Sequence, residues 1–171
     1  NWSEEIKEDY RQKYFFEYIK NIPARMFASE VIKKLHDEGN KIIIITGRYK
    51  TQENSKMGEQ MRSDTVNWLN ENKIFYDEIC YVHCPKTKEI QEKNIDIMID
   101  DSPEVISEAV RLTKVLCFDN RYNRDLIYNN MIRVFSWYDI YKKINGPFLQ
   151  PCPYRGQRSY RRHGQLKACE R

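Results

Sequence analysis

Runs of β-branched residues alternate along most of this chain with stretches in which apolar residues recur at helical spacing. The apolar runs predict strands at residues 41–46, 76–82, 95–99, 114–118 and 132–135. The helical stretches predict helices at residues 3–19, 28–38, 59–72, 86–93, 105–112 and 137–144. Strands that alternate with helices are typical of an α/β fold built on a parallel sheet.

Two of the predicted strands carry most of the information about the fold. Residues 42–45 are four consecutive isoleucines, which predict a strand buried on both faces, as in a parallel sheet. The strand at 95–99 ends abruptly in Asp100 and Asp101, and a Ser-Pro turn and a helical pattern follow. Capping of that helix is the simpler explanation of the two carboxylates, and binding of a cation is the functional one.

The predicted architecture is a Rossmann-like α/β domain with a mainly parallel sheet and flanking helices. Right-handed crossovers place the carboxyl ends of all parallel strands on one edge of the sheet. That edge then brings together Thr46, Lys86, the pair Asp100 and Asp101, and Asp119. Ligands of open α/β sheets bind at this edge, so we expect the functional site there.

Composition limits the classes of function. The chain has 171 residues and a net charge of +4, and 40% of its residues are hydrophobic. From residue 147 onward the charges sum to +5, so the rest of the chain is slightly acidic and we do not expect it to bind nucleic acid. We divide the chain into a partial helical cap (1–22), an α/β core (23–145) and a basic tail (146–171) expected to be disordered.

Cysteine usage and hydropathy bear on the location of the protein. The five cysteines have no metal-type spacing, which favours a reduced, cytoplasmic protein. No run approaches the ~20 apolar residues of a membrane span, and no signal peptide is recognisable, so we expect no membrane partner. The sequence leaves the oligomeric state open.

The side chains expected at the sheet edge suit a phosphate group and a divalent cation. Thr46 offers a hydroxyl, Gly47 allows close approach of backbone N–H groups, and Lys86 brings a positive charge. Asp100 and Asp101 offer the oxygen ligands that Mg²⁺ takes together with phosphate and water. Each residue alone has a simpler explanation, such as a solvated lysine or a helix cap, and only the combination favours phosphate chemistry.

The same residues resemble the haloacid dehalogenase (HAD) superfamily. The segments IIIITGR, with Thr46, and NIDIMIDDSPEVI, with Asp100 and Asp101, flank Lys86 in the order of that family's later motifs. With CFDNRYNR they resemble the nucleotidase branch, which includes 5′(3′)-deoxyribonucleotidases, over residues 12–144. The resemblance implies a phosphomonoesterase in which Thr46, Gly47, Arg48 and Lys86 bind phosphate and the acidic pair binds Mg²⁺. Lys88 is the alternative to Lys86.

One motif of that family has no counterpart before Thr46. The family carries its nucleophilic aspartate in a D-x-D motif at the end of an N-terminal strand, whereas Asp9 and Asp37 lie in helical patterns. We therefore expect this chain to lack that strand, which is central in the family's sheet, and to be inactive by itself. The strands that end at Thr46 and Asp100 would then have to pair directly, or the domain would be unstable alone.

The function predicted from the sequence is that of an Mg²⁺-dependent phosphomonoester hydrolase of nucleotidase type in its complete form. The substrate would be a small phosphorylated molecule such as a (deoxy)nucleoside monophosphate. The alternative is a non-catalytic Rossmann-like module that binds phosphate and Mg²⁺ or regulates another protein. Aromatic residues of the first helix either pack in its core or line a base-binding cap; they are Tyr10, Tyr14, Phe15, Phe16 and Tyr18.

Overall fold

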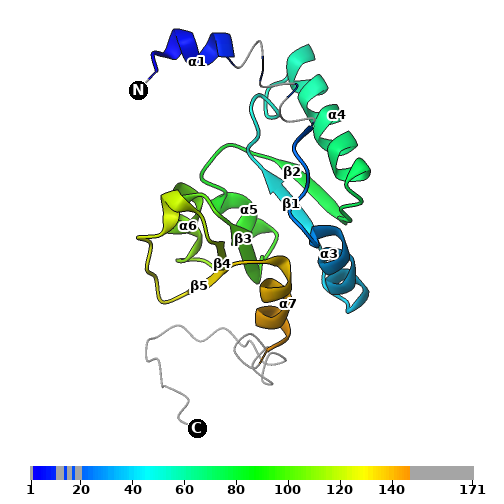
Figure 1. The fold of residues 1–171 in the computed structure, drawn as a ribbon, viewed down its shortest axis with the longest axis vertical. Helices are drawn as coiled ribbons and strands as arrows, with labels where there is room; N and C mark the ends of the chain where they lie inside the picture. The colour runs from blue at the N-terminus through cyan, green and yellow to red at the C-terminus, as the bar shows by residue number, and fades with distance from the viewer. Residues whose placement is uncertain (1, 11–13, 15–16, 18–20, 147–171) are drawn as a thin grey trace.

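The computed structural model describes residues 2–10, 14, 17 and 21–146. Phe15, Phe16, Tyr18 and the basic tail beyond residue 146 lie outside the described residues. The first described helix, α1 (Glu4–Tyr10), lies away from the strands (Figure 1). Among the described residues no helix has both the length and the apolar character to cross a membrane.

The first half of the core is a pair of strands flanked by two helices. Strand β1 (Ile43–Thr46) runs parallel to β2 (Glu78–Tyr81), with Ile45 opposite Cys80. Helix α3 (Ala28–Asp37) precedes β1, and α4 (Lys56–Glu71) connects the two strands. The N-terminus of α4 is fixed by Ser55, whose hydroxyl accepts a hydrogen bond from the backbone N–H of Gly58 at 3.1 Å.

The second half is a three-stranded parallel sheet in the order β3-β4-β5. Its strands are β3 (Ile97–Asp100), β4 (Lys114–Phe118) and β5 (Met131–Val134). Its helices are α5 (Thr87–Glu92), α6 (Pro103–Ala109) and α7 (Trp137–Asn145). The positions of these elements confirm the predicted α/β class and, to within a few residues, every predicted element from residue 28 onward.

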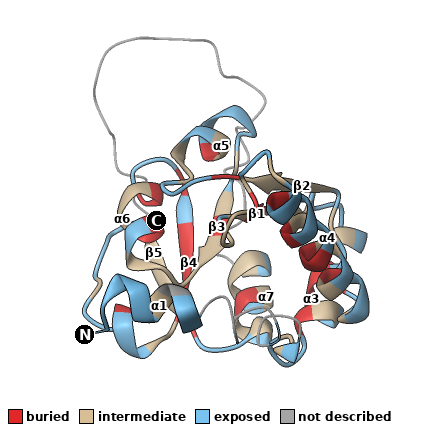
Figure 2. Ribbon diagram, turned by 90° about the horizontal axis from the view of Figure 1, so that it is seen from above, coloured by how far each residue is buried: buried red, intermediate tan, exposed pale blue. Residues whose placement is uncertain are grey.

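The core is most tightly packed around β4. Val115, Leu116 and Cys117 are fully buried, because β4 is paired on both edges and covered by α6 and by α7. Figure 2 shows this buried strand, and a second group of buried residues on α3 and α4. That second group, which includes Ile32, packs against Ile42 and Ile79 beside the first pair of strands.

Helices α3 and α7 join the two halves. The indole of Trp137 in α7 packs against the cluster formed by α3 and α4, although α7 follows β5 in the chain. Glu38, which follows α3, accepts hydrogen bonds from the Tyr141 hydroxyl at 2.5 Å and from the Asn145 amide at 3.0 Å. A helix contact and not a continuous sheet therefore connects the halves.

The structure excludes one of the two alternatives for the isoleucine strand and corrects the expectation about its burial. Among the described strands β1 pairs only with β2, so the direct pairing of the strands that end at Thr46 and Asp100 does not form. Of the isoleucines in β1 only Ile45 is buried, whereas Ile43 and Ile44 are half-buried, so the strand is not buried on both faces. The reason for both is the same, because one edge of β1 faces a cleft where a neighbouring strand was expected.

Candidate functional site

A cleft of about 830 Å³ separates the two halves and contains most of the predicted site residues. Thr46 and Arg48 reach it from the end of β1, and Lys86 reaches it from the residue before α5. Asp100 and Asp101 line it at the end of β3. The carboxyl ends of β1 and β3 therefore meet at one rim, as expected from the sequence. Asp119, which was expected there too, does not line the cleft and instead pairs with Arg133.

Gly47 supports the rim from behind and is not among the residues that line the cleft. A Cβ at this position would stand 3.2 Å from the Val82 carbonyl oxygen and 3.5 Å from Cys84 Sγ. A larger residue here would therefore push the two segments slightly apart, and a glycine lets them approach closely. The Gln52 amide also donates a hydrogen bond to the Val82 carbonyl at 2.6 Å, which fixes the loop after β1 against the segment after β2.

The backbone folds tightly between Thr46 and Thr51. The N–H of Arg48 donates to Thr46 Oγ1 at 3.3 Å, and the buried Thr51 hydroxyl donates to the Arg48 carbonyl at 2.7 Å. These contacts hold the Thr46 hydroxyl and the backbone of Arg48 in a fixed relation at the end of β1. The hydroxyl, as a donor, remains able to turn toward a ligand oxygen.

Arg48 is a positive charge at this rim that has no ion-pair partner among the described residues. Its guanidinium lies 5.1 Å from the centre of the Trp68 ring, and the Trp68 indole N–H donates to the Ile22 carbonyl at 2.6 Å. Burial lowers the pKa of Arg48, because the charged form loses part of its hydration. A guanidinium held against an aromatic ring in this way is well suited to bind an anion.

Lys86 and Asp100 form an ion pair within the cleft. Lys86 Nζ lies 2.7 Å from Asp100 Oδ2, and only 12% and 10% of the two side chains are exposed. The other oxygen, Asp100 Oδ1, accepts hydrogen bonds from the backbone N–H groups of Asp101 and Ser102, each at 2.9 Å. Lys88, the alternative to Lys86, has a 74% exposed side chain and does not line the cleft, so Lys86 is the one of the two that lies there.

The Asp101 carboxylate is held through one of its two oxygens. Oδ2 accepts hydrogen bonds from the Tyr122 hydroxyl at 2.6 Å and the Asn120 amide at 3.2 Å, and the Arg25 guanidinium is 3.6 Å away. Partial burial of the hydroxyl and its hydrogen bond to Asp101 raise the pKa of Tyr122 to about 12, so Tyr122 remains a donor near neutral pH. Within the described part of the chain Oδ1 of Asp101 has no such partner.

The loop after β4 positions these partners of Asp101. Asn123 is buried in the short 3₁₀ turn η2 (Arg121–Asn123), and its amide donates to the backbone carbonyls of Asp101 and Phe118, each at 2.8 Å. The Arg133 guanidinium on β5 donates to Asn123 Oδ1 at 2.8 Å and to Asp119 Oδ1 at 3.0 Å. The loop is therefore tied both to the end of β3 and to β5.

Sequence reasoning did not assign roles to Arg25, Tyr122 or Asn120. The position of Asp119 after a predicted strand placed this loop at the correct edge, and that was the signal available in the sequence. Arg25 precedes α3 and lies 4.4 Å from the centre of the Phe118 ring, a contact between distant segments that no local pattern indicates.

The carboxylate oxygens at the rim are of the type that Mg²⁺ takes as ligands. Within the described residues, no three His, Cys, Asp or Glu side chains gather as a complete metal-binding group. Mg²⁺ is typically held by one or two carboxylates, with phosphate oxygens and water completing its coordination. Asp100 and Asp101 supply such carboxylates, and the unpaired Oδ1 of Asp101 is the most available oxygen.

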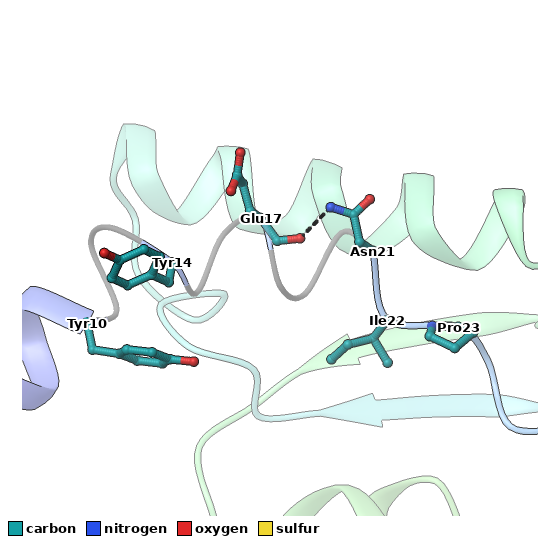
Figure 3. A pocket seen from close by; sticks show the side chains of 6 residues that line it. All are labelled: Tyr10, Tyr14, Glu17, Asn21, Ile22 and Pro23. Atoms are coloured by element: carbon teal, nitrogen blue, oxygen red, sulfur yellow. Dashed lines mark hydrogen bonds between the residues drawn. The ribbon is translucent and has the colours of Figure 1, made fainter.

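A second cavity, of about 680 Å³, is lined by residues near the N-terminus and by neither of the two aspartates. Figure 3 shows the residues that line it. Tyr10, Tyr14 and Ile22 line it, and the Asn21 amide donates to the Glu17 carbonyl at 2.8 Å. Tyr10 and Tyr14 are 41% and 56% exposed, so of the two alternatives for these rings, packing in a helix core is not the one observed.

Comparisons with known proteins agree with the chemistry of the cleft. A family model described as "5' nucleotidase, deoxy (Pyrimidine), cytosolic type C protein" matches residues 2–148. The chain is 34% identical over 134 residues to a putative 5′(3′)-deoxyribonucleotidase of Chlorobaculum tepidum, over 78% of this chain and 59% of that protein. It is 27% identical over 147 residues to a nucleotidase of Clostridium acetobutylicum, over 85% of this chain and 71% of that protein.

Two further findings concern the length of the relatives and the solved structures. The chain spans 59% of the length of the Chlorobaculum tepidum protein. No solved structure matches the chain significantly.

Proposed function

We propose, because this chain belongs to the family of cytosolic type C 5′(deoxy)nucleotidases, that its cleft rim binds the phosphate group of a nucleoside monophosphate together with Mg²⁺. The family is one of phosphomonoester hydrolases of HAD type, which confirms the resemblance found in the sequence. The observation that supports the proposal is the convergence of Thr46, Arg48, Lys86 and the acidic pair on one cleft. The family description also supports the predicted cytoplasmic location.

The phosphate would be bound by groups that donate hydrogen bonds or carry positive charge. The Thr46 hydroxyl would donate to its oxygens, and Arg48 would supply a guanidinium that has no carboxylate partner among the described residues. Gly47 does not line the cleft, and its part would be to let the two neighbouring segments approach closely. Lys86 is shared between Asp100 and the phosphate, so its ammonium group keeps a partner whether or not the phosphate is bound. Such fixed donors stabilise negative charge on the phosphoryl oxygens without reorganising during the reaction.

The acidic pair would hold the metal at the same rim. Asp101 would contribute Oδ1, and Tyr122 and Asn120 would keep the carboxylate in place through Oδ2. Asp100 would stay oriented by its two backbone N–H donors. Bound Mg²⁺ would neutralise charge on the phosphoryl group and orient it.

Hydrolysis needs a nucleophile in addition to these groups. At the carboxyl-end rim of the cleft the described carboxylates are those of Asp100 and Asp101, and both are assigned to the metal. We therefore expect this chain alone to bind phosphate and Mg²⁺ without turning over a phosphomonoester. The catalytic contribution of the residues present is charge stabilisation.

The test is a pair of binding measurements on the complete chain. Mn²⁺ serves as a paramagnetic probe of the metal site, and ³¹P NMR follows orthophosphate with and without Mg²⁺. We expect Asp101→Asn to weaken Mn²⁺ binding by at least about tenfold, because one anionic ligand becomes neutral. Asp125→Asn removes an exposed carboxylate outside the cleft and should leave Mn²⁺ binding unchanged.

Two results would contradict the proposal. If Asp101→Asn and the unaltered chain bind Mn²⁺ with equal affinity, the proposed metal site is wrong. If the double variant Arg48→Ala with Thr46→Val still binds orthophosphate as the unaltered chain does, the proposed phosphate site is wrong. A separate assay with an aryl phosphate and Mg²⁺ tests inactivity, and turnover that disappears in Asp101→Ala would show that the chain contains a nucleophile.

A further inference from the structure

A side chain on β5, that of Arg133, holds the loop between β4 and β5, residues 119–130. Arg133 Nη1 donates to Asp119 Oδ1 at 3.0 Å and to Asn123 Oδ1 at 2.8 Å. The second nitrogen, Nη2, donates to the backbone carbonyls of Asn123, Arg124 and Leu126, at 2.9, 3.2 and 3.2 Å. The guanidinium therefore contacts this loop from its first residue to Leu126.

The loop that Arg133 holds presents three side chains to Asp101. The Tyr122 hydroxyl and the Asn120 amide donate to Asp101 Oδ2, at 2.6 and 3.2 Å. The Asn123 amide donates to the backbone carbonyl of Asp101 at 2.8 Å. Both the carboxylate and the main chain of Asp101 are thus held from this loop. A carboxylate held in this way keeps its other oxygen, Oδ1, in a fixed direction.

Asn123 connects Arg133 to the residues that hold Asp101. Its side chain is buried, and its amide oxygen accepts hydrogen bonds from the Arg133 guanidinium and, at 3.0 Å, from the Asn120 N–H. Its Nδ2 donates to the carbonyls of Asp101 and Phe118. An amide side chain offers two donors and an oxygen with two lone pairs, so every hydrogen-bonding position of Asn123 is used. Loss of the guanidinium would remove one of the two bonds that fix the amide oxygen.

The chemistry of arginine suits this position. Its guanidinium presents five donors in a planar fork, whereas a lysine presents three donors on a single nitrogen. One nitrogen cannot reach both the Asp119 carboxylate and the carbonyls that Nη2 contacts. The Arg133 and Asp119 side chains are each 22% exposed, and their ion pair compensates the charge of both.

From these contacts we propose that Arg133 is a positioning residue of the metal site. Arg133 does not line the cleft, and it acts through Asn123, which sets Tyr122 and Asn120 against Asp101. The inference rests on the proposed function, in which Asp101 binds a divalent cation. Loss of a side chain that orients a metal ligand typically weakens metal binding by about 10–100-fold. We therefore expect Arg133→Met to weaken Mn²⁺ binding by about tenfold or more.

The experiment measures Mn²⁺ affinity of the complete chain by electron paramagnetic resonance. The matched control is Arg124→Met, because the Arg124 guanidinium also lies near the Asp119 carboxylate, with Nε 3.9 Å from Oδ2. Its side chain is 66% exposed. The control thus removes the same charge beside the same carboxylate, and it should bind Mn²⁺ as the unaltered chain does.

A second variant covers the case in which Arg133→Met does not fold. Arg133→Lys keeps a positive charge beside Asp119 but loses the planar fork. It should therefore fold and still bind Mn²⁺ more weakly than Arg124→Met does. Circular dichroism and thermal unfolding establish that each variant is folded before the affinities are compared.

A double-mutant cycle separates positioning from general stabilisation. Tyr122→Phe removes one hydrogen bond to Asp101 directly. If Arg133 acts through the loop, the double variant Arg133→Met with Tyr122→Phe should lose less Mn²⁺ affinity than the product of the two single losses. NMR gives a second readout, since the buried side-chain NH₂ protons of Asn123 should exchange slowly in Arg124→Met and fast in Arg133→Met.

Two results would overturn the inference and leave the metal site in place. One is unchanged Mn²⁺ affinity in folded Arg133→Met or Arg133→Lys while Asp101→Asn binds more weakly. The other is a double variant whose loss equals the product of the single losses, which would make Arg133 a stabilising residue only. If Asp101→Asn also binds Mn²⁺ as the unaltered chain does, the proposed metal site is wrong and the inference fails with it.

Discussion

At the scale of single residues, Asp100 and Asp101 are adjacent in sequence but are held in different ways. Asp100 is nearly buried, and both of its oxygens are satisfied by Lys86 and by backbone N–H groups. Asp101 is more exposed and is held through one oxygen by side chains from another loop. The first arrangement fixes the end of β3, whereas the second leaves an oxygen available to a ligand.

The buried ion pair gives the first prediction. Lys86→Met leaves the Asp100 carboxylate without its cation, and we expect a loss of about 3–5 kcal/mol in the free energy of unfolding. The double variant Lys86→Met with Asp100→Asn should recover part of that loss, because no uncompensated charge remains. Urea denaturation measures both. Lys88→Met, at an exposed position on α5, should change stability by no more than about 0.5 kcal/mol.

At the scale of elements, helix α7 connects the two halves of the molecule. It packs on β5 within its own half and on α3 of the other half. Its first turn is fixed by Ser136, whose hydroxyl accepts from the Asp139 N–H at 3.1 Å, and Asp139 in turn accepts from the Phe135 N–H at 3.2 Å. The start of the helix is thereby set, and with it the place of Trp137 in the cleft.

Removal of the cap tests this role. Ser136→Ala should lower the free energy of unfolding by about 1 kcal/mol, because an N–H at the start of α7 loses its acceptor. Chemical denaturation followed by tryptophan fluorescence measures the change. Ser107→Ala on α6 is the control, since that exposed hydroxyl only donates to the Glu104 carbonyl within its own helix. Equal effects of the two substitutions would contradict the capping role.

The link between β2 and α5 gives a prediction about pH. Hydrogen bonds from Lys93 and Lys41 lower the pKa of Glu78 to about 2 from an ordinary value of 4.5. A carboxylate with a lowered pKa stabilises the fold above its ordinary value, and that contribution disappears as pH falls from about 4.5 to 2. Unfolding free energy should therefore fall less steeply over that range in Glu78→Gln. Glu92→Gln on α5 should retain the original slope.

At the scale of the whole molecule, the chain consists of two half-sheets that share a rim of polar residues and a helix contact. β4 is paired on both edges, whereas β1 and β3 each have an open edge toward the cleft. The predicted alternative to direct pairing was instability of the isolated domain. The structure shows that β1 and β3 do not pair, and that α3, α7 and the Lys86–Asp100 ion pair connect the two halves.

Hydrogen exchange tests this organisation. The amides of Ile43 and Ile45 point toward the open edge, so we expect them to exchange faster than those of Val115, Leu116 and Cys117 in β4. Native-state exchange followed by NMR or mass spectrometry measures the order. Protection of Ile43 equal to that of the centre of β4 would contradict an open edge in solution.

The sequence by itself determined the elements and the identity of the rim residues. The isoleucine run, the helical spacing of 28–38 and the carboxylates after 95–99 are local patterns, and local patterns report which face of an element is buried. The right-handed crossover rule then placed Thr46, Lys86, Asp100 and Asp101 on one edge without further information.

Only the tertiary structure decided how the strands are paired and which side chains hold Asp101. The apolar residues of a strand indicate that it is buried, but they do not indicate which strand pairs with it. Pairing depends on segments that are distant in the chain. For the same reason Arg25, Tyr122 and Asn120 could not be assigned from their surroundings in sequence. The separation of β1 from β3 by a cleft is therefore a property of the folded molecule, because it depends on contacts between segments that are distant in the chain.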